Sequence, residues 1–537
     1  MAQAAPEPDV IAHGHLHLVS KALTLLMAIG MAAPPTNAER TPPAAQNAGF
    51  VVEDATIASI HRALSAGTVT CVDVVQAHVR RIEAYDKRGP ALNAIITINP
   101  LAVEAAADLD RTATRSALRP LHCIPLILKD NFDTADMPTT GGSLTFAGSV
   151  PLRDAFVVKK LRQAGAIVLG KANMTELALG GNTVSSLGGQ TKNPYDLTRT
   201  PGGSSGGTGA AIAASFGVIG TGTDTGQSVR SPASAQNLVG LRPTRGLISR
   251  SGIIPISTTQ DEPGPITRTV EDAARMLDVM AGYDPGDPIT AFGANRIPST
   301  YTAFLGAGRL KGVRIGILTQ FFGREAVHED VNRVTDAAIE TMTRAGAIVL
   351  RITIPELERL TQDIQVADYE ARAAFDEYLA TRGPRAPVRS LDEFIARGEF
   401  HPSIKASLEA ERRASRDDIE YTNRLQRRQD LRQAVMTAFA ANQLDAILYP
   451  HQRRLVVRIG EEQVERNGVL SNSTGFPAIT FPGGFSRPTD SAPLGVPVGI
   501  ELLGPEWSEP TLLGLAFAFE QLARLRQPPA STPPLLH

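Results

Sequence analysis

The sequence predicts an α/β fold, in which buried strands alternate with helices. Short apolar runs of strand length recur along the 537-residue chain, and they are separated by stretches whose apolar residues follow the period of a helix. Hydrophobic residues make up 42% of the sequence and charged residues 20%, which is the composition of a globular protein. The length exceeds the usual single core of about 250–300 residues, although α/β folds of this size also occur as one domain.

A leader and a linker are predicted for residues 1–48. Residues 22–33 form a 12-residue apolar stretch, which is too short to span a bilayer as a helix. Thr36 and Ala38 follow it and fit a small-residue cleavage site, whereas the two acidic residues ahead of it weaken its likeness to a signal peptide. We expect export to the periplasm or the medium, with a docked or disordered arm on a cytoplasmic protein as the alternative.

The charge balance and the cysteines exclude several classes of site. The formal net charge is -2, so there is no basic excess for binding nucleic acid or an anionic membrane. We therefore expect neither as a partner. The only cysteines, Cys71 and Cys123, are too few for a disulfide framework or a cysteine-built zinc site, and we expect inert thiols.

The folded domain is predicted to cover residues 51–526. It begins with two helices between residues 56 and 85, which are divided at Gly67. Further elements follow from the periodicity, namely strands at 123–128, 166–169, 315–318 and 347–354, and a helix at 155–164. The highly charged residues 357–442 predict a solvated helical layer, and the Pro-rich residues 527–537 predict a frayed tail.

The most informative segment is rich in glycine and serine and runs from Arg199 to Arg245. Glycines tolerate positive φ and leave amide N–H groups unshielded, so this backbone suits the binding of an anion or an oxyanion. A phosphate-binding P-loop is disfavoured, because G-x-x-x-x-G-K-[ST] is absent and the segment holds no lysine. A flexible linker is also disfavoured, since the small apolar run at 210–214 predicts a packed helix directly after the loop.

A histidine-dependent serine esterase is one interpretation of this segment. Gly203, Ser205 and Gly207 satisfy the G-x-S-x-G pattern of a nucleophile elbow, and His401 or His451 would serve as the base. The pattern is short, and glycine-rich loops match it by chance.

Four longer motifs are far more specific. They read GGSSGG, GTDTGQSVRSP, VGLRPTRGLISRSGIIP and QDEPGPITRTVEDAA. Together they resemble the amidase signature family, and the resemblance extends from about Thr56 to Leu525. It implies a single α/β domain at 51–526, with a large mixed, twisted β-sheet flanked by helices on both faces, and no metal or organic cofactor.

The resemblance also implies a triad of two serines and a lysine. The family's nucleophile, in a G-G-S-[IV]-R element, corresponds to Ser228, and its bridging serine, which follows a cis peptide bond, corresponds to Ser204. The family's base corresponds to Lys129, directly after the apolar run 125–128. An ordinary lysine has a pKa of about 10.4, so burial must lower the pKa for Lys129 to act as a neutral base.

Supporting residues are assigned by the same resemblance. The backbone N–H groups of the oxyanion hole are expected from Thr225, Gly226, Gln227 and Ser228. Accessory roles are expected for Ser205 and Arg230, and structural roles for Asp224, Gln260, Asp261 and the NSTGFPAITFPGGF segment from Asn472. Gln227 stands where the family most often has glycine, so we expect it to affect specificity, and His451 is a candidate substrate contact.

The expected function is hydrolysis of amide C–N bonds through an acyl-enzyme, which releases an acid and ammonia or an amine. The substrate is a small-molecule or peptide amide, because the QDEPGPITRTVEDAARMLDVMAG and DYEARAAFDEYL segments resemble the peptide amidase and aryl acylamidase type. Three alternatives remain: the histidine-dependent esterase, the amidotransferase subunit that supplies ammonia for misacylated transfer RNA, and a noncatalytic binding protein. The presence of all three triad residue types argues against the last.

Overall fold

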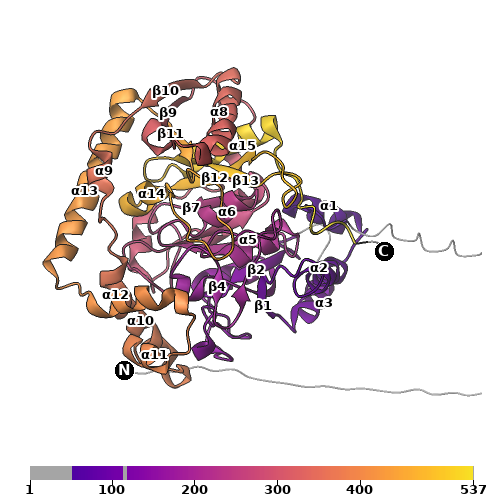
Figure 1. Cartoon of the computed structure of the whole chain (residues 1–537). Helices are drawn as coiled ribbons and strands as arrows, with labels where there is room; N and C mark the ends of the chain where they lie inside the picture. The colour runs from indigo at the N-terminus through magenta and orange to yellow at the C-terminus, as the bar shows by residue number, and fades with distance from the viewer. Residues whose placement is uncertain (1–50, 113–117, 536–537) are drawn as a thin grey trace, which may run out of the picture. The chain divides into compact units, whose positions relative to one another are not determined.

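The computed structural model describes residues 51–112 and 118–535, and the predicted leader and linker lie outside them (Figure 1). The described residues group into one compact unit. The first two helices begin and end as the sequence predicts. Thr56 caps the first by accepting a hydrogen bond from the Ser59 N–H, and Gly67 ends it with a φ of 67°.

The described residues contain one 11-stranded mixed sheet in the order β1-β3-β2-β6-β8-β7-β12-β13-β11-β9-β10. Strands β2, β3 and β6 run parallel, as do β9, β10 and β11, and the other neighbours pair antiparallel. The strands of this sheet are β1 Ile95–Ile98, β2 Pro125–Lys129, β3 Ile167–Ala172, β6 Ile219–Asp224, β7 Val239–Arg242, β8 Glu262–Thr267, β9 Arg314–Leu318, β10 Ile348–Ile352, β11 Ala446–Pro450, β12 Ala478–Phe485 and β13 Pro497–Leu503. Strands β4 Val184–Ser185 and β5 Gly189–Gln190 form a separate pair.

Helices cover this sheet, and α10 to α12 cluster together beyond it (Figure 1). Their bounds are α1 Ile57–Ala66, α2 Cys71–Tyr85, α3 Ala102–Thr112, α4 Phe156–Gln163, α5 Gly206–Ala213, α6 Arg230–Ala235, α7 Val270–Met280, α8 Glu329–Arg344, α9 Leu357–Thr361, α10 Ala367–Arg382, α11 Leu391–Arg397, α12 Lys405–Arg413, α13 Ile419–Asn442, α14 Val469–Thr474 and α15 Glu509–Ala523. The strands predicted from apolar runs are β2, β3, β9 and β10, so the α/β prediction is confirmed.

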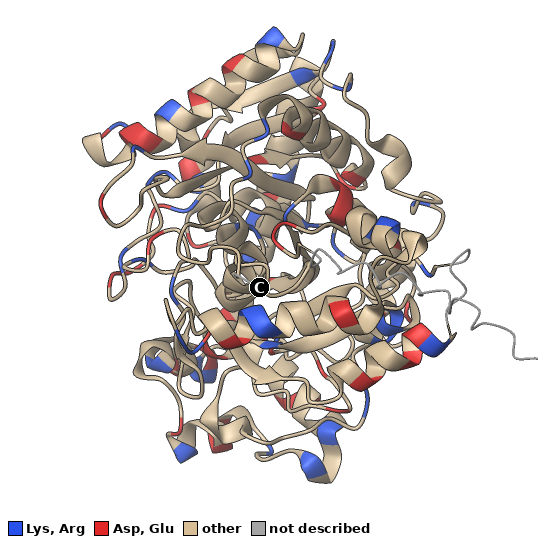
Figure 2. Ribbon diagram, turned by 90° about the vertical axis from the view of Figure 1, so that its right-hand side faces the viewer, with Lys and Arg blue, Asp and Glu red and all other residues tan. Residues whose placement is uncertain are grey.

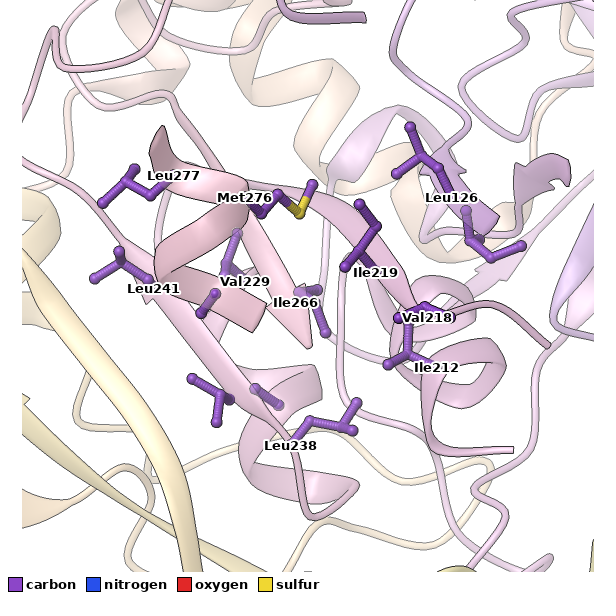
Figure 3. Packing of buried hydrophobic residues seen from close by; sticks show 14 of the residues in the cluster. Leu126, Ile212, Val218, Ile219, Val229, Leu238, Leu241, Ile266, Met276 and Leu277 are labelled. Atoms are coloured by element: carbon purple, nitrogen blue, oxygen red, sulfur yellow. The ribbon is translucent and has the colours of Figure 1, made fainter. Parts of the chain in front are cut away.

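The core forms where α5, α6 and α7 pack against β6, β7 and β8 (Figure 3). Ile212, Ile219, Val229 and Ile266 are fully buried there. Helix α5 approaches β6 so closely that a Cβ at Gly220 would collide with the Thr208 methyl group. The small residues of the glycine-rich segment therefore serve close helix–strand packing.

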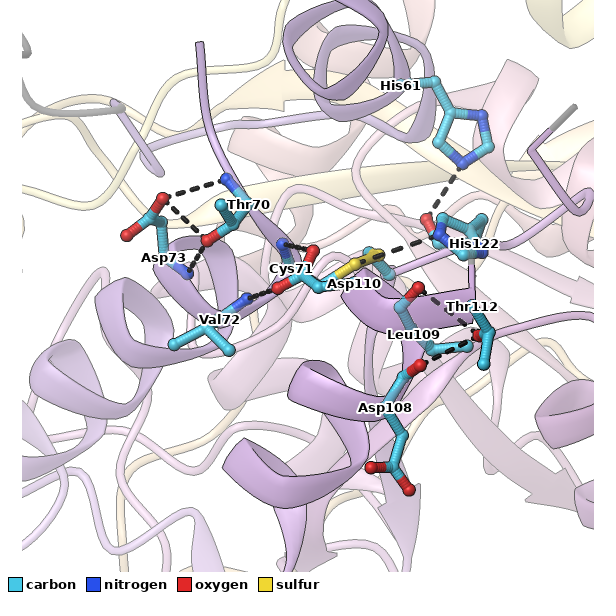
Figure 4. Close-up of a disulfide and its surroundings, with 11 residues drawn as sticks. His61, Thr70, Cys71, Val72, Asp73, Asp108, Leu109, Asp110, Thr112 and His122 are labelled. Atoms are coloured by element: carbon cyan, nitrogen blue, oxygen red, sulfur yellow. Dashed lines mark hydrogen bonds between the residues drawn. A yellow bond between two sulfur atoms is a disulfide. The ribbon is translucent and has the colours of Figure 1, made fainter. Parts of the chain in front are cut away.

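The two cysteines form a disulfide, which corrects the prediction of inert thiols (Figure 4). Cys71 begins α2 and Cys123 lies two residues before β2, with their Cα atoms 5.2 Å apart. Asp110 on α3 accepts hydrogen bonds from the N–H groups of Cys71 (2.8 Å) and Val72 (3.1 Å). The disulfide therefore joins the N-terminal helices to the segment that leads into β2.

The Pro-rich end is docked as far as it is described, whereas the sequence predicted fraying. Arg81 on α2 donates hydrogen bonds to the carbonyl oxygens of Thr532 (2.8 Å) and Pro533 (3.1 Å). Tyr85 donates to the Pro533 carbonyl at 2.8 Å. Because these partners are far apart in the sequence, no local pattern identifies the docking.

Basic and acidic residues are interspersed along the helices (Figure 2). The layer at 357–442 is helical as predicted, but it is not solvated throughout. Glu370, Arg382, Glu411 and Arg428 of this layer are all less than 9% exposed. No helix among residues 51–112 and 118–535 is long and apolar enough to cross a membrane.

Candidate active site

Lys129 is the last residue of β2, and the parallel strand β6 ends beside it with Thr223 and Asp224. Because the carboxyl ends of neighbouring parallel strands meet at one edge of the sheet, the lysine and the loop after β6 come together. The Lys129 side chain is fully buried. Its Nζ lies 2.7 Å from Oγ of Ser204 and 2.7 Å from Oγ1 of Thr223.

Burial lowers the pKa of Lys129 to about 7, and the negative charges of Asp224 and Asp261 limit the decrease. Neither carboxylate contacts the amine, since Asp224 bonds to Arg230 and Arg242, and Asp261 accepts from Thr225. The sequence-based prediction of a lysine that is neutral near pH 7 thus has a physical cause in burial without a direct counter-ion.

The peptide bond between Gly203 and Ser204 is cis, as the resemblance implies. The Ser204 side chain is fully buried, and its carbonyl oxygen accepts a hydrogen bond of 3.0 Å from the Thr175 N–H. Helix α5 begins two residues later. The buried position of Ser204 lets it contact Lys129, but not the solvent.

Ser228 follows β6 and is 8% exposed, whereas Ser204 and Lys129 are 0% exposed. Of the three triad residues it is therefore the one that a substrate can reach. No hydrogen bond joins the hydroxyl groups of Ser228 and Ser204 in the described structure. The two residues are linked instead through Ser205, which follows Ser204 in the chain and whose backbone N–H donates to the Ser228 carbonyl oxygen at 3.3 Å.

The loop from Thr225 to Ser228 has a one-sided pattern of hydrogen bonds. All four of its carbonyl oxygens accept: Thr225 from Gln260, Gly226 from Arg230 and Asn472, Gln227 from the Ser231 N–H, and Ser228 from the Ser205 N–H. No residue in the described ranges accepts a hydrogen bond from any of the four backbone N–H groups. Four free donors held in a fixed loop are what an oxyanion hole requires.

Arg230 holds this loop in place from a fully buried position. It pairs with Asp224 (3.0 Å) and Glu501 (2.7 Å), and it donates to the Gly226 carbonyl at 2.8 Å. The guanidinium groups of Arg230 and Arg242 hold the pKa of Asp224 far below its usual range against the opposing effect of burial. The predicted accessory role of Arg230 is thus a positioning role.

Ser205 directly precedes α5 and makes no side-chain capping hydrogen bond; its hydroxyl donates to the Thr223 carbonyl oxygen at 3.4 Å. The contact of Ser205 with the triad is made by its backbone N–H, which donates to the Ser228 carbonyl oxygen. Gln227 lies so close to Gly468 that a Cβ at the glycine would collide with the glutamine side chain.

The histidines give no support to the esterase interpretation. His401 contacts Ser403, and the fully buried His451 pairs with Glu501 at 2.6 Å. Neither is bonded to Ser205, so the elbow lacks a base. The burial of His451 also makes the predicted substrate contact wrong.

Sequence reasoning missed three contributors to the site. Thr223 bonds to the lysine amine, and Asn131 donates to the Thr223 hydroxyl at 3.0 Å. The sequence places Asn472 only in a buried turn, yet it supports the oxyanion loop. Thr223 lies within the motif that drew attention to Ser228, and Asn131 lies two residues after Lys129. The two-residue period of a strand could have placed Thr221 and Thr223 on one face of β6.

A cavity of about 240 Å³ opens beside these groups. Its lining includes the polar residues Asn131, Thr223 and Thr225, together with Ile254 and Tyr378. The mixture of apolar walls and a few polar groups is typical of a small-molecule binding site.

Comparison with known proteins agrees with this geometry. A family model described as Amidase matches residues 73–513. A probable amidase of Arabidopsis thaliana is 37% identical over 505 residues, which cover 89% of this chain and 92% of the relative. A glutamyl-tRNA(Gln) amidotransferase subunit of Geobacter sp. (strain M21) is 35% identical over 486 residues, which cover 87% of this chain and 97% of the relative.

The fold comparison gives the same result. The native peptide amidase from Stenotrophomonas maltophilia superposes with a TM-score of 0.80 at 36% identity, covering 88% of this chain and 98% of the other. The chain belongs to the amidase family, and it is a hydrolase of amide C–N bonds.

Proposed function

We propose that this amidase cleaves carboxamides through an acyl-enzyme on Ser228, with Ser204 and Lys129 carrying the proton. The observation that carries the proposal is the 2.7 Å contact between the buried Lys129 amine and the Ser204 hydroxyl. A buried amine with a pKa of about 7 is a base poised near neutral pH.

In the first half-reaction, the neutral Lys129 amine accepts the Ser204 proton while Ser204 takes the proton of Ser228. The Ser228 oxygen attacks the amide carbonyl, and the proton returns through Ser204 to the leaving nitrogen as the C–N bond breaks. Water then attacks the acyl-enzyme by the same route and releases the acid. The relay requires the Ser228 hydroxyl to approach Ser204 when substrate binds, since catalytic hydrogen bonds often tighten only in the complex.

The negative charge that develops on the carbonyl oxygen would be held by the free N–H groups of the 225–228 loop. Because Gln260, Asn472 and Arg230 fix the loop's carbonyl groups, these donors need no reorganisation. Removing one such donor typically costs about 10²–10³-fold in rate.

For the substrate, we propose the carboxamide end of a peptide, which releases ammonia. Support comes from similarity to the peptide amidase over 88% of this chain. The amidotransferase subunit is the second candidate, because a relative of that name is 35% identical over most of its length. That candidate predicts glutamine as the ammonia source.

The experiment measures ammonia release by the purified chain from an N-acetylated dipeptide amide and from glutamine, with anilides as further substrates. We expect the peptide amide to be the preferred substrate and Ser228→Ala to abolish its turnover. Preference for glutamine would replace the substrate proposal by the amidotransferase candidate. Absence of amide cleavage would refute the triad mechanism.

We also propose that the protein is exported. The apolar stretch at 22–33 and the Cys71–Cys123 disulfide support this, because disulfides persist in oxidising compartments. Sequencing the N-terminus of the mature protein tests it: cleavage near Ala38 is expected, and an intact leader in the cytoplasmic fraction would contradict it.

A further inference from the structure

A second cavity, of about 360 Å³, lies where α13 packs against α14. Arg428 and Arg432 are four residues apart on α13 and so lie on one face of this helix, and Arg245 enters from the loop after β7. Among the described residues that line the cavity, Glu506 is the only one with a carboxylate. Three guanidinium groups beside one carboxylate give the cavity an excess of positive charge.

The single carboxylate already has a partner. Glu506 pairs with one nitrogen of Arg432 at 2.7 Å, and another nitrogen of Arg432 donates to the Thr474 carbonyl oxygen at 2.8 Å. Arg245 and Arg428 form no ion pair with any residue in the described ranges. The charge of these two arginines is therefore not balanced within the cavity.

Arg428 keeps its charge in a buried position. It is 6% exposed, and it donates to two uncharged groups, the side-chain oxygen of Gln260 at 3.3 Å and the carbonyl oxygen of Asn472 at 2.7 Å. Burial, together with repulsion from Arg242 and Arg245, lowers the pKa of Arg428 to about 10, so the group is still charged at neutral pH. A buried charge without a paired counter-charge is costly.

Glu370 is the carboxylate that attracts Arg428 most, but its own hydrogen bonds are made with other groups. Its oxygens accept from the hydroxyl groups of Ser257, Thr259 and Tyr421 and from the Thr259 N–H. It does not contact the Arg428 guanidinium group in the described structure. Glu370 thus reduces the cost of the buried charge without acting as its hydrogen-bonded partner.

Arg245 has hydrogen-bond donors that the protein leaves unused. Its side chain is half-buried and donates one hydrogen bond, to the Thr258 carbonyl oxygen at 3.3 Å. Its buried Nε–H has no acceptor among the described residues. A guanidinium group carries five N–H donors in a planar fork that matches the oxygens of a phosphate or a carboxylate.

The cavity can be reached from the surface. The side chains of Arg432 and Glu506 are 33% and 35% exposed, and Gln429, which also lines the cavity, is exposed. The volume is many times the roughly 15 Å³ that one water molecule needs on this measure. A small solute therefore has both a way in and enough room.

We propose that this cavity binds a doubly charged oxyanion of the phosphate type between Arg245 and Arg428. The two guanidinium groups supply the positive charge and the forked donors that recognise such an anion. The site is separate from the active-site cavity, with which it shares no lining residue. The proposal goes beyond the amidase activity, and its test does not depend on amide hydrolysis.

Arg245 is the residue to replace in this test. Arg428 is less suitable, because its two acceptors, Gln260 and Asn472, hold carbonyl groups of the 225–228 loop. A change at Arg428 would therefore disturb the active site as well. Arg245 contacts neither of these acceptors through its side chain in the described structure.

The test measures binding of inorganic phosphate to the purified chain by isothermal titration calorimetry, at constant ionic strength and at about pH 8, where phosphate is mainly doubly charged. Wild type should bind phosphate saturably, and phosphate should raise its midpoint of thermal unfolding, because a ligand of the folded state stabilises it. Arg245→Gln should weaken the affinity by about tenfold or more. The matched control Arg344→Gln removes an exposed arginine of α8 that pairs with Glu340, and it should leave the affinity unchanged.

Absence of saturable phosphate binding in wild type, or equal affinity in Arg245→Gln and wild type, would overturn the proposal. Acetate tests the charge of the ligand: it should bind more weakly than phosphate, and equal affinity would contradict a site for a doubly charged anion. Should Arg245→Gln not fold, Glu506→Gln decides the matter. Removing the lining carboxylate should tighten phosphate binding, and an unchanged affinity would count against the site.

Discussion

The amine of Lys129 lies 2.7 Å from the hydroxyl of Ser204, and both side chains are fully buried. The lysine has no carboxylate in contact, so its neutral form is favoured by its surroundings. Lysine is usually a charged surface residue, but burial beside the Ser204 hydroxyl makes Lys129 a candidate general base.

The pH dependence of activity should follow Lys129. Because burial lowers its pKa to about 7, the amine is protonated and inactive at low pH, and kcat/KM should rise as pH increases through about 7. A pH profile of peptide-amide hydrolysis between about pH 5 and 9 measures this. Glu262 is the control, because burial raises its pKa to about 8 and its titration could also produce a rise in activity near this pH. The Glu262→Gln variant should show the same increase of kcat/KM with pH as wild type. A flat profile would contradict the base assignment.

Asn472→Ala should slow catalysis without unfolding the protein. Its amide donates to the Gly226 carbonyl at 2.9 Å, so its loss lets the oxyanion loop relax. We expect kcat to fall by about fivefold, as a hydrogen bond contributes about 1 kcal/mol, with a smaller change in KM. Asn442→Ala, which removes an amide bonded to the Ala438 carbonyl on α13, should leave kcat unchanged. Equal kcat values for the two variants would rule out the positioning role.

Glu501→Gln should destabilise the fold strongly. The carboxylate pairs with Arg230 at 2.7 Å and His451 at 2.6 Å, and it accepts from Tyr449 at 2.8 Å, all fully buried. Breaking one partner of a buried pair costs about 3–5 kcal/mol. Urea unfolding of variant and wild type at neutral pH gives the difference, and a loss below about 1 kcal/mol would contradict the account.

Acid should remove the stabilisation of the fold that the Glu501 carboxylate provides. Arg230 and the bonds from His451 and Tyr449 lower the pKa of Glu501 to about 2, from an ordinary value of 4.5. A lowered carboxyl pKa means that the stabilisation is full above the ordinary value and is lost as pH falls through the lowered one. The stability difference between wild type and Glu501→Gln should therefore shrink below pH 4.5. A difference that stays constant down to about pH 2 would argue against an ionised Glu501.

The disulfide should contribute to stability but not to chemistry. It closes a loop between residues 52 positions apart, for which such bonds contribute about 2–4 kcal/mol. Cys71→Ser with Cys123→Ser should lower the midpoint of thermal unfolding while the folded enzyme keeps its kcat. Dithiothreitol should lower the midpoint of wild type alone, and an equal effect on the double variant would show that the bond is absent in solution.

Much of the fold and the triad could be predicted from the sequence, because both depend on local patterns. Apolar runs identified β2, β3, β9 and β10, and motif resemblance identified Lys129, Ser204 and Ser228. The free donors of the 225–228 loop also follow a local motif, but the residues that orient the loop do not. Asn472 is 246 residues away from Gly226, and no period in the sequence links them.

The corrections concern long-range partners in the same way. Cys71 and Cys123 looked like single thiols because their pairing depends on how α2 meets β2. Glu411 belongs to a charged helical stretch that predicts a solvated face, and only the packing of α12 against the 255–261 loop buries it. A sequence pattern cannot predict the burial of a charged residue, because charge in the pattern is taken to indicate exposure.

The most direct test of the triad is peptide-amide hydrolysis by Lys129→Ala beside wild type and Ser228→Ala, with folding of each checked by circular dichroism. We predict that both folded variants lose kcat/KM by at least about 10³-fold, because the nucleophile and its base act as one unit. A folded Lys129→Ala variant that keeps near-wild-type hydrolysis would show that another group activates Ser228.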